Sequence, residues 1–254
     1  MSTPRIVAYR SPELLAAATA ARLVTRLVDA QAARGSASVV LTGGRTGTAV
    51  LEQVRAAPAR DAVDWSRVDI YWGDERFLPA GDPERNETQA RAALLDHVPV
   101  DPARVHAMAA SDAGLAPEAA ADAYADLLER AARPEDHAVP SVDVCLLGVG
   151  EEGHTASIFP GSAAVYETER TVVAVHGCPK PPPVRISLTL PAIRRASEVW
   201  LVTTGEGKAA AVAMALGGAG EVALPAAGAR GRRRTLWLLD KAAAAKAPGM
   251  SSLP

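Results

Sequence analysis

The stretch VDVCLLGVGEEGHTASIFP, residues 142–160, decides how the chain is expected to fold. Its hydrophobic first part, Val142 to Leu147, predicts a buried strand, and a Gly-x-Gly turn ends that strand. Two carboxylates and a histidine follow within four residues, at Glu151, Glu152 and His154. In an open α/β sheet, ligands bind at the loops that leave the carboxyl ends of the strands. An imidazole there can take a proton from water, so this loop predicts a hydrolytic or proton-transfer site.

The composition is that of one globular domain, which we expect to span residues 1–254. The chain is 48% hydrophobic and 22% charged, with a formal net charge of −2. It shows no internal repeat and no linker long enough to separate two domains. The net charge argues against bulk binding to nucleic acid or membranes. The sequence has no apolar run of membrane-spanning length and no signal-peptide pattern, which predicts a cytoplasmic protein.

Strand and helix patterns alternate along the chain. We predict strands at 6–9, 38–41, 68–72, 142–147, 171–175, 184–188, 198–203 and 235–239. Helical patterns follow most of them, beginning with a Ser-Pro-Glu start at 11–13. The alternation predicts a doubly wound, mostly parallel sheet with helices on both faces, a Rossmann-like α/β fold. Segments 73–85 and 219–234 are expected to be loops, and the proline-rich segment 178–183 a stiff connector.

Three other predicted strands also end in polar or glycine-rich loops. The residues that draw attention there are Gly43, Gly44, Arg45, Asp74, Arg76 and Lys208. Glycines let backbone N–H groups converge on an anion, arginine offers a rigid fork for phosphate, and a lysine at a helix start is favourable only near an anion. Each loop alone is also consistent with a tight connection, a solvated turn or an exposed lysine. Because parallel strands place such loops at one edge of the sheet, together they predict a site for a small anion, most simply a phosphorylated metabolite.

The remaining basic and titratable residues are not assigned a role. The run Arg230–Arg234 is compatible with nucleic-acid binding, but no aromatic side chains surround it, and a solvated loop is the better interpretation. The other histidines are scattered among loops and helix ends, and none lies at metal-ligand spacing from His154. They are His97, His106, His137 and His176.

In the order of its motifs, the chain resembles the family of 6-phosphogluconolactonases and glucosamine-6-phosphate deaminases. The matching segments cover nearly the whole chain and are 41–44, 72–76 with Pro79 and Asn86, 148–160, 185–189, 205–209 and 238–243. The resemblance implies the sugar-phosphate isomerase type of α/β fold. It also implies hydrolysis of 6-phospho-D-glucono-1,5-lactone to 6-phosphogluconate in the oxidative pentose phosphate pathway, without a metal or organic cofactor.

The resemblance also implies roles for the site residues. His154 would be the general base on a water that attacks the lactone carbonyl, and Glu152 would orient the imidazole or the water. The phosphate would be held by Arg76 and Lys208 with backbone N–H groups of the glycine loop, and the substrate site would further include Gly43, Gly44, Arg45 and Asp74. The implied partner is a phosphorylated sugar lactone, with no nucleic acid or membrane, on a monomer or weak homo-oligomer.

Two positions separate the lactonases from the deaminases. The deaminase branch carries a tyrosine where this chain has Arg76, and a glutamate where it has Phe159. That glutamate assists ring opening in the deaminases, so its absence favours the lactonase. A non-enzymatic sugar-phosphate sensor is a further alternative, but no helix-turn-helix pattern accompanies the fold. The chain also departs from the usual family pattern, with Glu152 in place of aspartate and Arg45 in place of serine.

Overall fold

A six-stranded parallel sheet forms the centre of the computed structural model, which describes residues 3–134, 136 and 138–248. The strand order is β1-β9-β8-β5-β2-β3. The strands are β1 (Arg5–Tyr9), β2 (Ala37–Leu41), β3 (Val68–Trp72), β5 (Val144–Leu147), β8 (Glu198–Thr203) and β9 (Arg234–Asp240). Each neighbouring pair runs parallel, which confirms the predicted doubly wound sheet.

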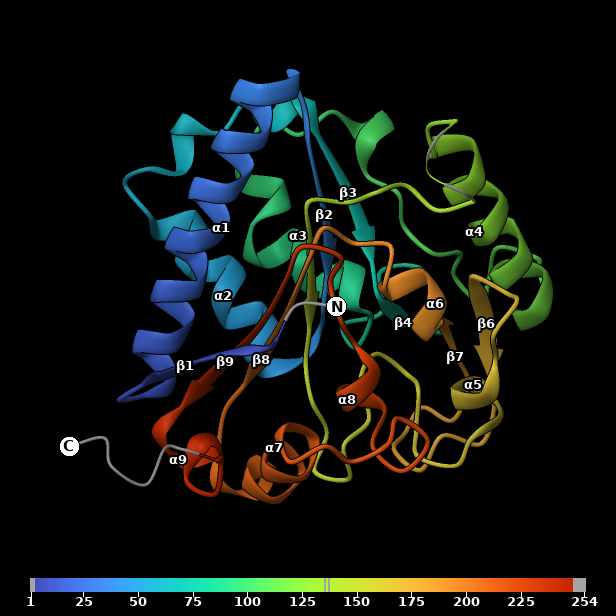
Figure 1. Ribbon diagram of the computed structural model, residues 1–254. Helices are drawn as coiled ribbons and strands as arrows, with labels where there is room; N and C mark the ends of the chain where they lie inside the picture. Colours follow the sequence, from blue (N-terminus) through green and yellow to red (C-terminus); the bar gives the residue numbers. More distant parts are fainter. Residues whose placement is uncertain (1–2, 135, 137, 249–254) are drawn as a thin grey trace.

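Helices cover both faces of this sheet, with α1 and α2 on one side and α4 and α6 on the other (Figure 1). The α-helices are α1 (Pro12–Arg34), α2 (Gly44–Ala56), α3 (Asn86–Ala93), α4 (Pro117–Ala131), α5 (Ala163–Tyr166), α6 (Leu190–Ile193), α7 (Ala209–Leu216), α8 (Pro225–Gly228) and α9 (Lys241–Ala244). Short 3-10 helices lie at Arg60–Ala62, Trp65–Arg67, Leu95–His97, Pro102–Arg104 and Glu206–Lys208. Helix α1 starts as predicted, because the Ser11 side chain accepts a hydrogen bond from Leu14 N and Pro12 occupies the first turn.

A second, three-stranded antiparallel sheet stands beside the main one, in the order β4-β7-β6. It contains β4 (Asp74–Arg76), β7 (Arg185–Leu188) and β6 (Val172–Val175). The prediction that 73–85 is wholly loop is therefore wrong at its beginning. The chain changes sheets at Gly73, whose N–H donates to Leu41 O at 3.0 Å while its carbonyl accepts from Leu188 N at 2.9 Å. Three residues are too few to show an alternating pattern, so the sequence did not reveal β4.

The segment 219–234 also differs from the predicted surface loop. It contains the buried four-residue helix α8, where Ala226 N donates to Gly153 O at 3.0 Å and so fixes the His154 loop from outside. Farther along, Arg232 N donates to Ala196 O and Arg233 N to Ser197 O, at 2.9 and 2.8 Å. The backbone of the arginine run is therefore fixed to the segment that leads into β8.

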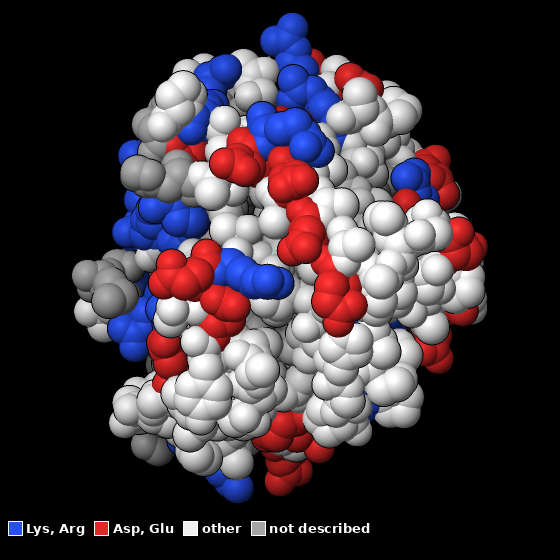
Figure 2. Space-filling view, turned by 90° about the vertical axis from the view of Figure 1, so that its right-hand side faces the viewer, with Lys and Arg blue, Asp and Glu red and all other residues white. Residues whose placement is uncertain are grey.

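Acidic side chains form a row across the face made by α4 and β6 (Figure 2). The exposed carboxylates of α4 recur at helical spacing and are Glu118, Asp122, Asp126 and Glu129. Such spacing is typical of a solvated helix face. Among the described residues, no helix is both long and apolar enough to cross a lipid bilayer.

Candidate active site

A cavity of about 450 Å³ lies at the carboxyl ends of the parallel strands. It receives residues from the loops after β2, β3, β5 and β8, as the sequence predicted. Every predicted site residue except Glu152 lines it. Its walls are formed by Thr42, Gly43, Gly44, Arg45, Asp74, Arg76, Asn86, Gly148, Val149, Gly150, His154, Ala156, Lys180, Pro181, Arg185 and Lys208.

A tight turn after β5 presents the imidazole of His154 to this cavity. Gly150 N donates to His154 O at 2.9 Å, and Gly153 N donates to Gly150 O at 3.1 Å. A Cβ atom on Gly150 would lie 2.0 Å from His154 Nδ1, so only glycine lets the ring lie against this turn. On the other side, the Phe159 ring packs against the imidazole, with centroids 4.5 Å apart.

The charges around His154 form a chain of three groups. Glu152 Oε1 lies 3.1 Å from His154 Nδ1, and Glu152 Oε2 accepts a hydrogen bond from Lys180 Nζ at 3.1 Å. The first of these contacts is outside hydrogen-bond geometry, so Nδ1 is buried without a hydrogen-bond partner in the described part of the chain.

These neighbours set the protonation of both groups. Burial lowers the pKa of His154, and the ammonium of Lys180 lowers it further, while the Glu152 carboxylate opposes them. Burial raises the pKa of Glu152, but its backbone N–H and the charges of His154 and Lys180 outweigh burial and hold that pKa at about 2. Near neutral pH the imidazole is therefore neutral, and Glu152 is ionised.

Arg76 reaches the cavity from β4 and is held by two acceptors. Its NH1 group donates to Glu84 O at 2.6 Å and to Asn86 Oδ1 at 3.1 Å. Its Nε is buried and makes no hydrogen bond to any described residue. The guanidinium is thus held in place by protein acceptors at the wall of the cavity.

The carboxylate of Asp74 is buried and already occupied by protein groups. It accepts from Ser157 Oγ at 2.7 Å and from Asn86 Nδ2 at 3.3 Å, and it lies 4.0 Å from Arg185 NH1. Asp74 therefore lines the cavity as predicted, while its hydrogen bonds hold Asn86 and Ser157 in place.

Among the lining residues that were given no site role from the sequence are three with amide or charged side chains, Asn86, Lys180 and Arg185. Asn86 was named only as part of a segment that matches the family, and Lys180 lies inside the proline-rich connector. Arg185 is buried in β7, where its NH2 group donates to Lys180 O at 3.0 Å. Arginine is rarely buried, so its place inside a predicted strand was the sequence signal that could have pointed to a role for Arg185.

The glycine loop and Lys208 complete the cavity. Helix α2 begins at Gly44, so its first turn carries the loop's N–H groups. A Cβ atom on Gly43 would lie 1.8 Å from Asn86 Oδ1, which makes glycine necessary there. Lys208 ends a short 3-10 helix before α7, and its Nζ lies 3.6 Å from Glu151 Oε1. Arg45 is exposed at the cavity rim.

No metal-binding cluster of three or more histidine, cysteine and carboxylate side chains occurs among the described residues. The expectation that the reaction needs no metal stays a prediction. His97, His106 and His176 do not line the cavity, and His137 lies outside the described residues.

Comparison with known proteins identifies the family. The family described as Glucosamine-6-phosphate isomerases/6-phosphogluconolactonase matches residues 10–237. The chain belongs to this family. A 6-phosphogluconolactonase of Streptomyces coelicolor is 68% identical over 97% of this chain and 95% of its own length. A 6-phosphogluconolactonase of Mycobacterium tuberculosis is 53% identical over 94% of this chain and 97% of its own.

The structure of this chain also resembles a solved structure of a 6-phosphogluconolactonase. The 6-phosphogluconolactonase from Trypanosoma brucei superimposes with a TM-score of 0.79 at 28% identity, over 95% of this chain and 98% of that one. The family fold therefore accounts for nearly the whole chain, including both sheets.

Proposed function

We propose that this chain hydrolyses 6-phospho-D-glucono-1,5-lactone to 6-phosphogluconate, the second step of the oxidative pentose phosphate pathway. Family membership and the named relatives support the proposal. The observation that carries it is a single cavity in which a neutral, partly buried imidazole faces several cationic side chains. Such a cavity suits a substrate with a phosphate at one end and a hydrolysable carbonyl at the other.

In the proposed mechanism, His154 removes a proton from a water molecule as that water attacks the lactone carbonyl. The carboxylate at Nδ1 favours the tautomer with a proton on Nδ1, which leaves Nε2 as the base. The C1–ring oxygen bond then breaks, and the imidazolium returns its proton to the departing oxygen. Positioned proton transfer of this kind contributes about 10²–10⁴-fold to the rate.

The cationic side chains bind the other end of the substrate. Arg76 and Lys208 hold the phosphate, together with N–H groups at the start of α2, and Arg45 contacts it from the rim. Each hydrogen bond to a charged group contributes about 1.5–3 kcal/mol to the binding free energy. Asp74 does not contact the substrate in this mechanism but holds Asn86 and Ser157 in place. Glu152 orients the imidazole of His154.

The test is a coupled assay in which 6-phosphogluconate is oxidised as it forms from freshly generated lactone. The lactone also hydrolyses spontaneously, so the enzyme-free rate must be subtracted. Activity on the phosphorylated lactone in clear excess over unphosphorylated gluconolactone is expected. A rate no higher than the spontaneous rate would overturn the proposal.

A further inference from the structure

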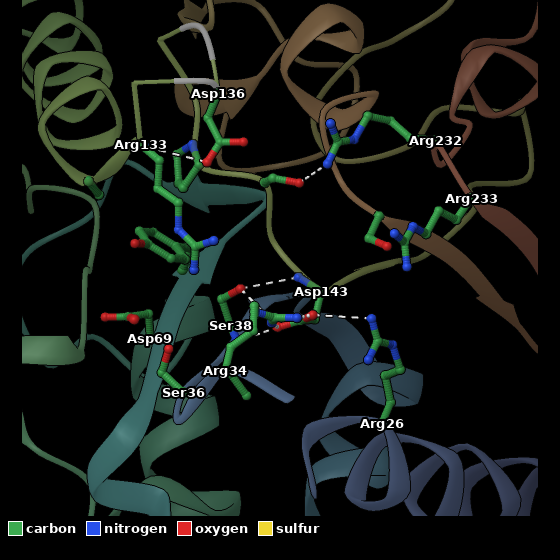
Figure 3. A pocket seen from close by; sticks show the side chains of 16 residues that line it. Arg26, Arg34, Ser36, Ser38, Asp69, Arg133, Asp136, Asp143, Arg232 and Arg233 are labelled. Atoms are coloured by element: carbon green, nitrogen blue, oxygen red, sulfur yellow. Dashed lines mark hydrogen bonds and ion pairs between the residues drawn. The ribbon is translucent and has the colours of Figure 1, made fainter. Parts of the chain in front are cut away.

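A second cavity, of about 490 Å³, lies at the other end of the parallel sheet. Ser38 and Asp69 line it from the beginnings of β2 and β3, and Asp143 and Ser197 line it just before β5 and β8 (Figure 3). Because these strands are parallel, their amino ends are remote from the His154 loop. We call this the arginine cavity, after its lining residues Arg26, Arg34, Arg133, Arg232 and Arg233.

The carboxylates of the arginine cavity are already engaged. Asp143, with its side chain 3% exposed, pairs with Arg34 at 2.6 Å and with Arg26 at 3.2 Å. One buried carboxylate thus faces two guanidinium groups. Asp69 pairs with Arg104, which lies outside the cavity lining, at 2.8 Å. The third aspartate, Asp136, accepts from Arg133 N at 3.4 Å.

Three arginines of the cavity make no ion pair with a described carboxylate, namely Arg133, Arg232 and Arg233. Arg232 donates to the hydroxyl of Ser141, and Arg233 makes no ion pair with a described residue. The next residue, Arg234, differs because it lies 3.8 Å from Glu198 and does not line the cavity. Figure 3 shows Arg133 on one side of the cavity and the Arg232–Arg233 pair on the other.

We propose that the arginine cavity binds a small phosphorylated anion, as a site separate from the substrate cavity. Guanidinium groups form paired hydrogen bonds with phosphate oxygens. Serine hydroxyls supply further donors around them, at Ser36, Ser141 and Ser197, while the hydroxyl of Ser38 already donates to Asp143. The volume lies within the range of about 300–1,000 Å³ found for small-molecule sites. The aspartates between the arginines favour a compact anion over a nucleic-acid strand, whose phosphates would pass close to them.

Binding would join segments that are far apart in the sequence. The arginines come from α1, from the loop after α4 and from the loop before β9. An anion held between them relieves the repulsion among their charges and binds only the folded chain. The anion therefore raises the stability of the fold by mass action. The proposal does not depend on the reaction assigned to the other cavity.

The test uses sodium pyrophosphate as the probe and isothermal titration calorimetry on the full chain. The double variant Arg232→Ala/Arg233→Ala should bind pyrophosphate at one site fewer than the wild type. The matched control, Arg230→Ala/Arg234→Ala, removes the same charge from the same run without touching the cavity lining, and it should keep the wild-type number. The variant Arg76→Ala/Lys208→Ala empties only the substrate cavity and should keep the arginine site.

Two further readouts separate binding from damage to the fold. Pyrophosphate should raise the unfolding temperature of the wild type more than that of Arg232→Ala/Arg233→Ala, whose lactone hydrolysis should match the wild type. The proposal is wrong if this variant and the wild type bind pyrophosphate alike, or if the control loses binding equally. Tighter binding of a short single-stranded oligonucleotide than of pyrophosphate would also overturn it.

Discussion

At His154, burial and the ammonium of Lys180 lower the pKa of the imidazole, while Glu152 raises it. The base is therefore neutral at the pH where the lactone must be hydrolysed. We expect His154→Ala to lower turnover by about 10²–10⁴-fold and to leave the affinity for 6-phosphogluconate largely intact, because the imidazole needs no contact with the phosphate. Single-turnover rates and product titrations measure the two effects. Near-normal turnover would remove His154 from the mechanism.

The same three residues predict opposite shifts of the pH profile. The rate depends on neutral His154, so kcat/KM should rise with pH through its pKa, which lies below the ordinary 6.5. Lys180→Met removes a charge that lowers this pKa and should move the acid limb to higher pH. Glu152→Gln removes a charge that raises it and should move the limb to lower pH, with a reduced plateau.

The measurement is kcat/KM from about pH 5 to pH 8, with the spontaneous rate subtracted at each pH. Arg45→Met serves as the control, because it removes a cation at the rim without a direct contact to Glu152. Shifts of both variants in the same direction would mean that His154 does not set the limb.

Phe159 separates the two activities of the family at a single position. Its ring packs on His154, at the place where the resemblance puts a glutamate in the deaminases. A phenyl ring cannot transfer protons, so the purified chain should release no ammonia from glucosamine 6-phosphate. Ammonia production at a rate comparable to lactone hydrolysis would overturn the lactonase assignment.

At the scale of elements, β4 is tied to the start of α3 through the buried Glu75. Its carboxylate accepts from Asn86 N at 2.7 Å, Glu87 N at 2.9 Å and Arg76 N at 2.8 Å. Burial raises its pKa to about 7, against the pull of these N–H groups and of Arg85. Glu75 therefore fixes the strand that carries Arg76 to the helix that carries Asn86.

This shifted pKa predicts how stability depends on pH. Folded Glu75 keeps its proton up to about pH 7, whereas the unfolded chain releases it near 4.5. Its contribution to the free energy of unfolding is thus full below 4.5 and declines as pH rises to about 7. Urea unfolding should show that, between about pH 5 and pH 8, the free energy of unfolding of the wild type falls relative to that of Glu75→Gln. An unchanged difference between the two proteins would contradict the raised pKa.

Arg76 on β4 of the antiparallel sheet and Lys208 after β8 of the parallel sheet meet in one cavity. Arg76→Ala and Lys208→Ala should each sharply reduce kcat/KM for the phosphorylated lactone, mainly through KM, and barely change the residual activity on gluconolactone. Glu151→Gln is the control for Lys208, because it removes the ion-pair partner but keeps the cation. Equal losses on both substrates would mean that the residues support the fold or the chemistry.

For the molecule as a whole, the sequence was most informative where the parallel strands end. Central parallel strands are continuous apolar runs, so glycine and charged residues directly after them stand out and share an edge. That reasoning placed His154, Arg76 and Lys208 in one cavity. It could not find Lys180 and Arg185, because their position depends on how the antiparallel sheet docks beside the main one. Elements of three or four residues, such as β4 and α8, are too short to show a period.

Among the described residues, the first strand pairs with the last, from Arg5 opposite Leu236 to Tyr9 opposite Asp240. During synthesis, β5 can pair with β2 and then receive β8, but β1 has no partner until β9 has left the ribosome. The growing chain therefore carries open strand edges on β1 and on β8 until β9 has been made. Open edges can pair with strands of other chains, so the nascent protein is most exposed to aggregation and to chaperones in the interval between the synthesis of β8 and that of β9.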